Sequence, residues 1–384
     1  MARKLSIMQI GGLGLPIRRD LKYGGTERAI SYLTDKLYEM GYDVIVAAPG
    51  DSDVNGTLIP TIPKSLWTHY GSMEKRYIEN PKGEYQEHYK KCIEYILEMR
   101  KIDVIHDHPG SGLITAEEYL KNKDRIDVLI LTTLHGKYEP DEEEKYRIWR
   151  NLKEEGRPVY FNALSNSQKT YFEEKAGIPI EAVIYHGVPK NIFSFEEHPK
   201  DYLFSIGRIC PEKGQHIAIK IAKKAGRKLV IAGEVHSVNG QYFKEMVEPQ
   251  LDGGQIRYIY SLNDEEKAVW FKNATAFLMP IMWPEPFGLV MVESMATGTP
   301  IVAFNYGSVS EIIKDGKTGY VIDEIRDNKG NINLDAMVEE AVDRVKKIDK
   351  IKREDCRQHF LNNFTSDIEA DNYIILYETI LKEF

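Results

Sequence analysis

The length, composition and charge of the chain exclude several classes of protein. Its 384 residues suggest two or three domains at roughly 150 residues each. Three widely spaced cysteines support neither a disulfide framework nor a zinc site, and a net charge of −8 gives no overall attraction to nucleic acid. The sequence contains no apolar run that could span a bilayer and no signal peptide, so we expect a cytoplasmic protein that does not bind nucleic acid.

Short β-branched runs alternate with helical patterns along the first half of the chain, which predicts βα units and parallel sheets. A helix opens at Gly24 and Gly25 and continues to Met40. Because glycine has no Cβ, these two residues allow a phosphate to approach the backbone closely. The strands expected in this half are 5–10, 44–48, 104–106, 128–134, 161–164 and 183–185.

Two histidines flank an aspartate at the end of the third expected strand. On a strand, His106 and His108 face the same side. A metal site is disfavoured because zinc usually has three or four ligands and no further ligand is evident. We expect these residues to lie beneath a ligand site and to hold the groups that contact the ligand.

A proline-punctuated segment, 188–199, separates the two halves and is interpreted as a linker. We therefore expect an N-terminal domain over 1–186, a C-terminal domain over 187–365 and a final helix over 366–384. That helix places Tyr373, Leu376, Tyr377 and Leu381 on one face. The strands expected in the second half are 202–206, 228–232, 257–260, 276–279 and 301–303.

Two cations lie in the loop after the first strand of the second half. Arg208 and Lys213 fall between that strand and a helix with apolar residues at every fourth position. Open α/β sheets bind their ligands at this kind of position, and two cations there can neutralise a diphosphate. Each residue taken alone is more often an ordinary surface charge.

Two glutamates eight positions apart, Glu285 and Glu293, enclose a turn followed by a helix over 289–296. The amides of residues 287–290 have no intrahelical acceptor, and such a helix end attracts phosphate. Glu293 lies about 7.5 Å beyond Gly288 along the helix axis, a distance that suits contact with a ribose hydroxyl beside the diphosphate. For each glutamate, a solvated surface position is the simpler alternative.

The ordered set of motifs resembles one enzyme family. Gly207-Arg208 with Lys213-Gly214, followed by the Glu285 to Glu293 segment, is similar to the retaining glycosyltransferases of the GT-B fold. Within that fold, the motifs resemble family four, which includes sucrose synthases and bacterial mannosyltransferases. The resemblance implies two Rossmann-like domains that face each other across a cleft, with the last helix crossing back to the N-terminal domain. This chain departs from the family at Tyr306-Gly307, where many members have two glycines.

The resemblance also implies a role for each candidate residue. Arg208 and Lys213 would bind the diphosphate, Glu293 the ribose, and Glu285 the transferred sugar. His135 corresponds to the family's histidine near the donor sugar. The remaining donor-binding candidates are the backbone amides or glycines of Gly24, Gly25, Phe287, Gly288 and Leu289.

The implied activity is hexose transfer, with retention, from a UDP- or GDP-sugar to a hydroxyl of a small-molecule, saccharide or lipid-linked acceptor. We expect no cofactor and no metal, since fixed cations supply the charge. The acceptor is expected to contact residues 50–89 and the loop after His135. Peripheral membrane contact is not favoured, because glutamates dilute the basic pairs in that region. A nucleotide-sugar epimerase of the same fold and a non-catalytic nucleotide-sugar-binding protein remain as alternatives.

Overall fold

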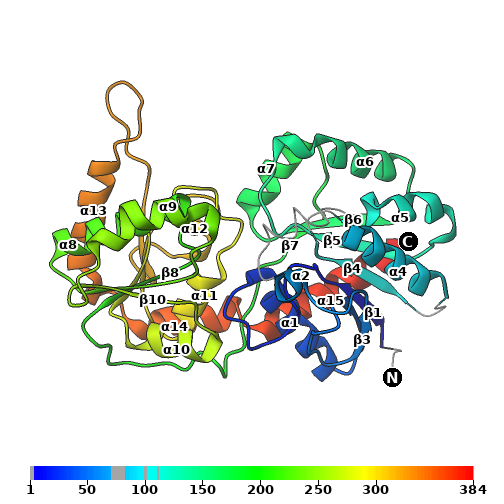
Figure 1. Ribbon diagram of the computed structural model, residues 1–384, viewed down its shortest axis with the longest axis horizontal. Helices are drawn as coiled ribbons and strands as arrows, with labels where there is room; N and C mark the ends of the chain where they lie inside the picture. Colours follow the sequence, from blue (N-terminus) through cyan, green and yellow to red (C-terminus); the bar gives the residue numbers. More distant parts are fainter. Residues whose placement is uncertain (1–3, 71–82, 99–101, 110–111, 384) are drawn as a thin grey trace. The chain divides into compact units, whose positions relative to one another are not determined.

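A computed structural model describes residues 4–70, 83–98, 102–109 and 112–383. The chain divides into two compact units, each an α/β structure (Figure 1). The N-terminal unit comprises residues 1–19, 24–185 and 366–384, and the C-terminal unit comprises residues 20–23 and 186–365. Both units therefore contain chain from more than one part of the sequence.

The N-terminal unit is built on a parallel seven-stranded sheet in the order β3-β2-β1-β4-β5-β6-β7. The strand order reverses between β1 and β4. The strands are β1 (Ser6–Ile10), β2 (Asp43–Ala48), β3 (Thr57–Pro60), β4 (Val104–Asp107), β5 (Leu129–Thr133), β6 (Val159–Ala163) and β7 (Ala182–Val183).

Alternating side chains of this sheet enter two separate apolar clusters, as the two-residue period of a strand requires. One cluster contains Ile7 of β1 and residues of the first and last helices, which lie side by side in Figure 1. The other contains Met8 of β1 with Cys92 and Trp149 from other helices. The helices are α1 (Gly25–Glu39), α2 (Leu66–Tyr70), α4 (Gly83–Glu98), α5 (Glu117–Asn122), α6 (Glu143–Glu154), α7 (Asn166–Ala176) and α15 (Ser366–Glu383).

The C-terminal unit is built on a parallel six-stranded sheet in the order β10-β9-β8-β11-β12-β13. Its strand order reverses between β8 and β11. The strands are β8 (Leu203–Ile206), β9 (Leu229–Ala232), β10 (Ile256–Ile259), β11 (Ala276–Met279), β12 (Ile301–Phe304) and β13 (Gly319–Ile322).

Helices also surround this second sheet. The expected linker, 188–199, is packed into the same unit: Phe193 is fully buried, and its carbonyl oxygen accepts a hydrogen bond from Arg357. The helices are α8 (Gln215–Ala225), α9 (Gly240–Tyr242), α10 (Asp264–Asn273), α11 (Leu289–Ala296), α12 (Val309–Ile312), α13 (Leu334–Lys346) and α14 (Arg353–Asn363), and a π-helical segment, Phe243–Val247, follows α9.

Three features differ from the sequence-based expectation. The strands β3 and β13 were not expected, because β3 is a short edge strand that ends in proline and β13 begins with a glycine after a turn. Residues 20–23, expected in the N-terminal domain, belong to the C-terminal unit. There the Tyr23 ring packs edge-on against the His236 ring, 5.0 Å between centroids.

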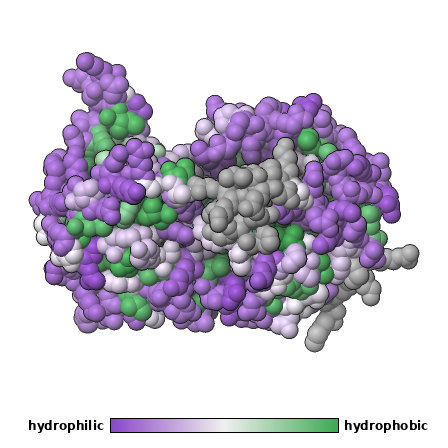
Figure 2. Space-filling model, viewed as in Figure 1, coloured by the Kyte–Doolittle hydropathy of each residue, from purple (hydrophilic) through white to green (hydrophobic). Residues whose placement is uncertain are grey.

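The visible surface is mostly hydrophilic, with apolar side chains in small separate groups (Figure 2). Scattered apolar groups of this kind are normal on a folded protein. Within the described ranges, none of the helices combines the length and the apolar character that crossing a membrane requires.

Candidate functional site

The loops after β8 and β11 carry the candidate residues of the C-terminal unit. The strand order reverses between these two strands, so the loops at their carboxyl ends diverge to opposite faces of the sheet. Ligands of open α/β sheets bind at this point. Arg208 and Lys213 follow β8, and Glu285 follows β11, so the topology brings together residues more than seventy positions apart in sequence.

Lys213 and Glu285 are in direct contact. The Lys213 ammonium lies 2.5 Å from a carboxylate oxygen of Glu285 and 4.6 Å from the centroid of the Trp283 ring. The indole N–H of Trp283 donates a 3.0 Å hydrogen bond to the same carboxylate oxygen. A cation, a carboxylate and an aromatic ring therefore form one cluster at the carboxyl end of the sheet.

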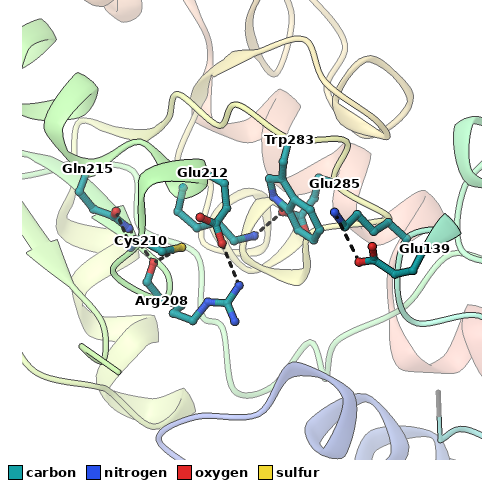
Figure 3. A network of polar contacts seen from close by, with 9 residues as sticks. Glu139, Arg208, Cys210, Glu212, Gln215, Trp283 and Glu285 are labelled. Atoms are coloured by element: carbon teal, nitrogen blue, oxygen red, sulfur yellow. Dashed lines mark hydrogen bonds and ion pairs between the residues drawn. The ribbon is translucent and has the colours of Figure 1, made fainter. Parts of the chain in front are cut away.

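Arg208 lies in the same loop as Lys213, and its guanidinium group is 3.0 Å from the carboxylate of Glu212. The Gln215 side chain fixes this loop: its amide group donates to the Arg208 carbonyl oxygen at 2.9 Å and accepts from the Cys210 N–H at 3.2 Å (Figure 3). Arg208 keeps a partly exposed side chain, whereas its backbone is held in place. This arrangement suits a cation that must meet a ligand in a fixed position.

Two glycines allow the loops to approach each other. Gly214 has φ 73°, and a Cβ there would lie 2.1 Å from the carbonyl oxygen of Pro280. Gly307 has φ 65°, and a Cβ there would lie 2.3 Å from the carbonyl oxygen of Glu285. The Ser308 N–H donates to that same oxygen at 2.9 Å. Many family members have two glycines where this chain has Tyr306-Gly307. The glycine present here, Gly307, lets the backbone of its loop approach and position Glu285.

The close approach at Gly214 leads to a prediction about stability. Gly214→Ala should lower the free energy of unfolding more than Gly226→Ala, since both residues have φ near 70° but only the first would meet another atom within 4 Å. An alanine at positive φ costs roughly 1–2 kcal/mol at either position. We expect the clash at Gly214 to add roughly 1–3 kcal/mol. Urea unfolding of the two variants measures the difference, and equal losses would contradict the described packing against Pro280.

The helix α11 begins where the sequence analysis placed it. Gly288 is the N-cap residue with φ 82°, Leu289 is the first helical residue, and Phe287 is buried before them. The Ser308 hydroxyl donates to the Phe287 carbonyl oxygen at 2.8 Å. The first-turn amides of a helix and its dipole favour an anion. Phe287, Gly288 and Leu289 therefore lie at an end of α11 suited to phosphate, beside Glu285.

Glu293 lies in a different environment from Glu285. Its side chain is completely buried, and one carboxylate oxygen lies 2.5 Å from the ammonium of Lys267. Lys267 is also buried and lies 2.7 Å from Asp264. The contact of Glu293 with a ribose stays a prediction. Lys267 and Asp264 were missed because charged residues are most often exposed, and nothing in the sequence separates a buried lysine from a surface one.

The candidate glycines of the N-terminal unit precede α1. Gly24 has φ 105°, and a Cβ there would lie 2.7 Å from a carboxylate oxygen of Glu27 and 2.7 Å from Leu15. Only glycine fits this position without strain. Gly25 is exposed and begins α1. Both glycines lie between β1 and the rest of α1 in the chain, and the strand order of this sheet reverses beside β1.

His135 follows β5 and is half-buried. Its Nε2 atom lies 2.9 Å from Nδ1 of His108. His108 and His106 have ring centroids 3.9 Å apart, so they face the same side, as expected. Across the described ranges, the acidic, histidine and cysteine side chains form no group of three that could ligate a metal.

Part of the expected acceptor region, residues 71–82 with Tyr77, Lys75 and Arg76, lies outside the described residues. Trp67 lies on α2, and the partly buried Tyr85 on α4 packs against the core of the N-terminal unit. The acceptor site stays a prediction.

Asp107 is a buried carboxyl group beside the histidines. One of its oxygens accepts a 2.6 Å hydrogen bond from the Leu113 N–H, and the other has no hydrogen-bond partner in the described part of the chain. Burial raises the pKa of Asp107 to about 7, although the Leu113 bond opposes this rise. Folding is therefore easier when this carboxyl group is protonated.

This pKa predicts a pH dependence of stability. The folded pKa lies above the ordinary value of 3.8, so between about pH 4 and pH 7 this carboxyl group holds its proton in the folded protein but loses it in the unfolded chain. The contribution of Asp107 to stability should fall as pH rises through that window, by up to about 4 kcal/mol. Asp107→Asn should remove this slope in urea unfolding at several pH values. An unchanged slope in the variant would mean that another group causes it.

Comparisons with known proteins agree with this geometry. The model described as "Glycosyltransferase Family 4" matches residues 23–191, and "Glycosyl transferases group 1" matches residues 189–355. Together the two matches cover residues 23–355, which leaves out β1 and α15 of the N-terminal unit. The chain therefore belongs to the glycosyltransferases, with a family 4 domain followed by a group 1 domain.

Individual relatives are more distant. An uncharacterised glycosyltransferase of Methanocaldococcus jannaschii is 26% identical over 61% of this chain and 64% of its own length. A D-inositol 3-phosphate glycosyltransferase of Arthrobacter is 30% identical over 32% of this chain, and the match spans 31% of that protein. The matched region thus covers less than two thirds of either relative.

Solved structures share the fold over almost the whole chain. Sucrose-phosphate synthase of Thermosynechococcus elongatus has a TM-score of 0.77 at 16% identity, covering 99% of this chain and all of that one. The Anabaena protein HepE, in complex with UDP and glucose, has a TM-score of 0.70 at 18% identity, covering 98% and 100%. At such identities the likeness establishes two Rossmann-like domains of the GT-B fold.

Proposed function

We propose that this protein is a retaining glycosyltransferase that moves a hexose from a UDP- or GDP-sugar to a hydroxyl group. The acceptor is a small molecule, a saccharide or a lipid-linked molecule. The observation that carries the proposal is the Lys213–Glu285 contact where the strand order of the C-terminal sheet reverses, with Arg208 in the same loop. Cations and a carboxylate lie next to each other in this arrangement, which supports a site for a diphosphate and its sugar.

Charge development explains the need for these cations. When the bond between the anomeric carbon and the diphosphate breaks, positive charge grows on the sugar ring and negative charge on the leaving oxygen. Lys213, Arg208 and the amides at the start of α11 stabilise the negative charge, and they are already in place before the reaction. The Lys213 ammonium exchanges part of its contact with Glu285 for the diphosphate, which leaves the Glu285 carboxylate to accept hydrogen bonds from sugar hydroxyls.

The transfer itself balances without a protein nucleophile. The acceptor oxygen forms a bond to the anomeric carbon on the face from which the diphosphate leaves, and the acceptor's proton passes to a diphosphate oxygen. In this front-face route His135, Gly24 and Gly25 contact the donor. Because Lys213 and Arg208 supply the positive charge, we propose that no divalent metal is needed, so turnover should be equal in excess EDTA and in Mg²⁺.

A donor panel tests the proposal. Melting temperatures are measured with UDP-, GDP- and ADP-sugars, because a ligand at 100 times its Kd stabilises the folded state by about 2.7 kcal/mol. The preferred donor is then incubated with acceptors, and NMR assigns the product anomer. Retention and acceptor-dependent product support the proposal. An inverted product, or an isomerised free sugar without acceptor, would contradict it.

A further inference from the structure

A row of polar side chains is buried within the N-terminal unit at the carboxyl ends of its central strands. Gln9 of β1 pairs in register with His106 of β4, and Thr133 of β5 pairs with Asn162 of β6. All four residues are buried. Tyr373 and Tyr377 of α15 contact the same row. Buried polar groups are costly unless their hydrogen bonds are satisfied, so the direction of each bond in this row is constrained.

The bond directions at His106 follow from the single hydrogen of the Thr133 hydroxyl. Thr133 donates that hydrogen to the Asn162 carbonyl oxygen at 2.7 Å. The Thr133 hydroxyl oxygen also lies 2.6 Å from Nε2 of His106. Because its hydrogen is already used, this oxygen accepts a hydrogen bond from Nε2. Nε2 of His106 carries the hydrogen, and Nδ1 of the neutral ring accepts from the Tyr377 hydroxyl at 2.7 Å.

The same reasoning extends to His108 through Gln9. The side-chain carbonyl oxygen of Gln9 lies 2.6 Å from Nε2 of His108, and a carbonyl oxygen can only accept a hydrogen bond.

His108 then determines the state of His135. Since the Gln9 oxygen accepts, His108 Nε2 carries the hydrogen, and Nδ1 of the neutral His108 ring is an acceptor. His135 Nε2 lies 2.9 Å from that Nδ1 and must donate to it. Nδ1 is then the nitrogen at which a neutral His135 ring accepts a hydrogen bond.

We propose that Gln9 and His108 are positioning residues that fix the ring orientation and the Nε2–H tautomer of His135. The inference rests on the proposed function, in which His135 contacts the donor sugar. A ring fixed in this way accepts a hydrogen bond from a sugar hydroxyl through Nδ1 and does not donate one. The buried polar row would therefore favour donor sugars that have a hydroxyl group able to donate to Nδ1 of His135.

Histidine NMR tests the tautomer without any activity measurement. Two-bond proton–nitrogen correlation in alkaline buffer, where the rings are neutral, distinguishes Nε2–H from Nδ1–H histidine. The His135 signals are assigned by their loss in His135→Ala. We expect the Nε2–H pattern for His135 in the wild type and a mixture of both tautomers in His108→Phe. His88→Phe is the matched control, because His88 is buried in the same unit but contacts Thr61.

Kinetics separate positioning from a purely structural role. His108→Phe should lower kcat/KM roughly 10- to 100-fold, the scale of a misplaced contact group. His108→Asn, whose amide oxygen can accept from His135, should recover part of this loss. Gln9→Leu, a second variant if His108→Phe does not fold, should also mix the His135 tautomers. An Nδ1–H pattern in the wild type, or a His135 pattern unchanged in Gln9→Leu, would overturn the proposal. Absence of sugar transfer with the expected tautomer would instead refute the proposed function.

Discussion

Replacing Lys213 with alanine is expected to lower the turnover of sugar transfer roughly 100- to 1,000-fold, on the scale of removing one oxyanion donor. The ammonium is held 2.5 Å from Glu285 and 4.6 Å from the Trp283 ring, and in our proposal it exchanges part of its contact with Glu285 for the diphosphate. Its contribution grows as negative charge develops on the leaving oxygen. We therefore expect the larger part of the loss in kcat, measured with the donor that the thermal-shift panel selects.

Lys220→Ala is the matched control for this variant. Lys220 lies on α8, shortly after the Lys213 loop, and its exposed ammonium pairs with Asp335 on the surface. We expect near-normal turnover in that variant. Near-normal turnover in a folded Lys213→Ala protein would remove Lys213 from the mechanism.

Replacing Lys267 with methionine should destabilise the protein by about 3–5 kcal/mol, because breaking a buried ion pair leaves an uncompensated charge. Lys267 and Glu293 are both buried, and Asp264 lies 2.7 Å from the same ammonium. Two carboxylates would then lie together without a cation. Urea unfolding at neutral pH measures the loss, which should shrink at acid pH as the carboxylates become protonated.

Two comparisons isolate the buried pair. Lys220→Met breaks only an exposed pair with Asp335 and should cost about 0–1 kcal/mol. The double variant Lys267→Met with Glu293→Leu should be more stable than Lys267→Met alone, because one of the two stranded charges is gone. Wild-type stability in Lys267→Met would show that the carboxylate of Glu293 is not buried as described.

Most of the architecture could be predicted because it depends on local patterns. Alternation of β-branched runs with helical periods indicated two parallel sheets, and the helix α11 has the expected bounds, Leu289–Ala296. The strands β3 and β13 were not predicted, because they are short and contain proline or glycine. The attachment of residues 20–23 to the C-terminal unit depends on tertiary contacts such as that of Tyr23 with His236, which leave no local pattern.

The candidate site could be predicted as a set of loops but not as a set of contacts. The sequence indicated that Arg208 and Lys213 follow a strand and that Glu285 precedes a helix, and the structure has them in these places. It did not indicate that Trp283 and Glu285 hold Lys213, since that pairing depends on two loops more than seventy residues apart. The burial of Glu293 beside Lys267 is hidden for the same reason.

The crystal structure of the complex with the preferred nucleoside diphosphate is the most direct test of the central claim, that the C-terminal unit binds a diphosphate where its strand order reverses. We predict that phosphate oxygens lie within hydrogen-bond distance of the Lys213 ammonium, the Arg208 guanidinium and the first-turn amides of α11. A diphosphate bound away from these groups, with the Lys213–Glu285 contact unchanged, would contradict the account.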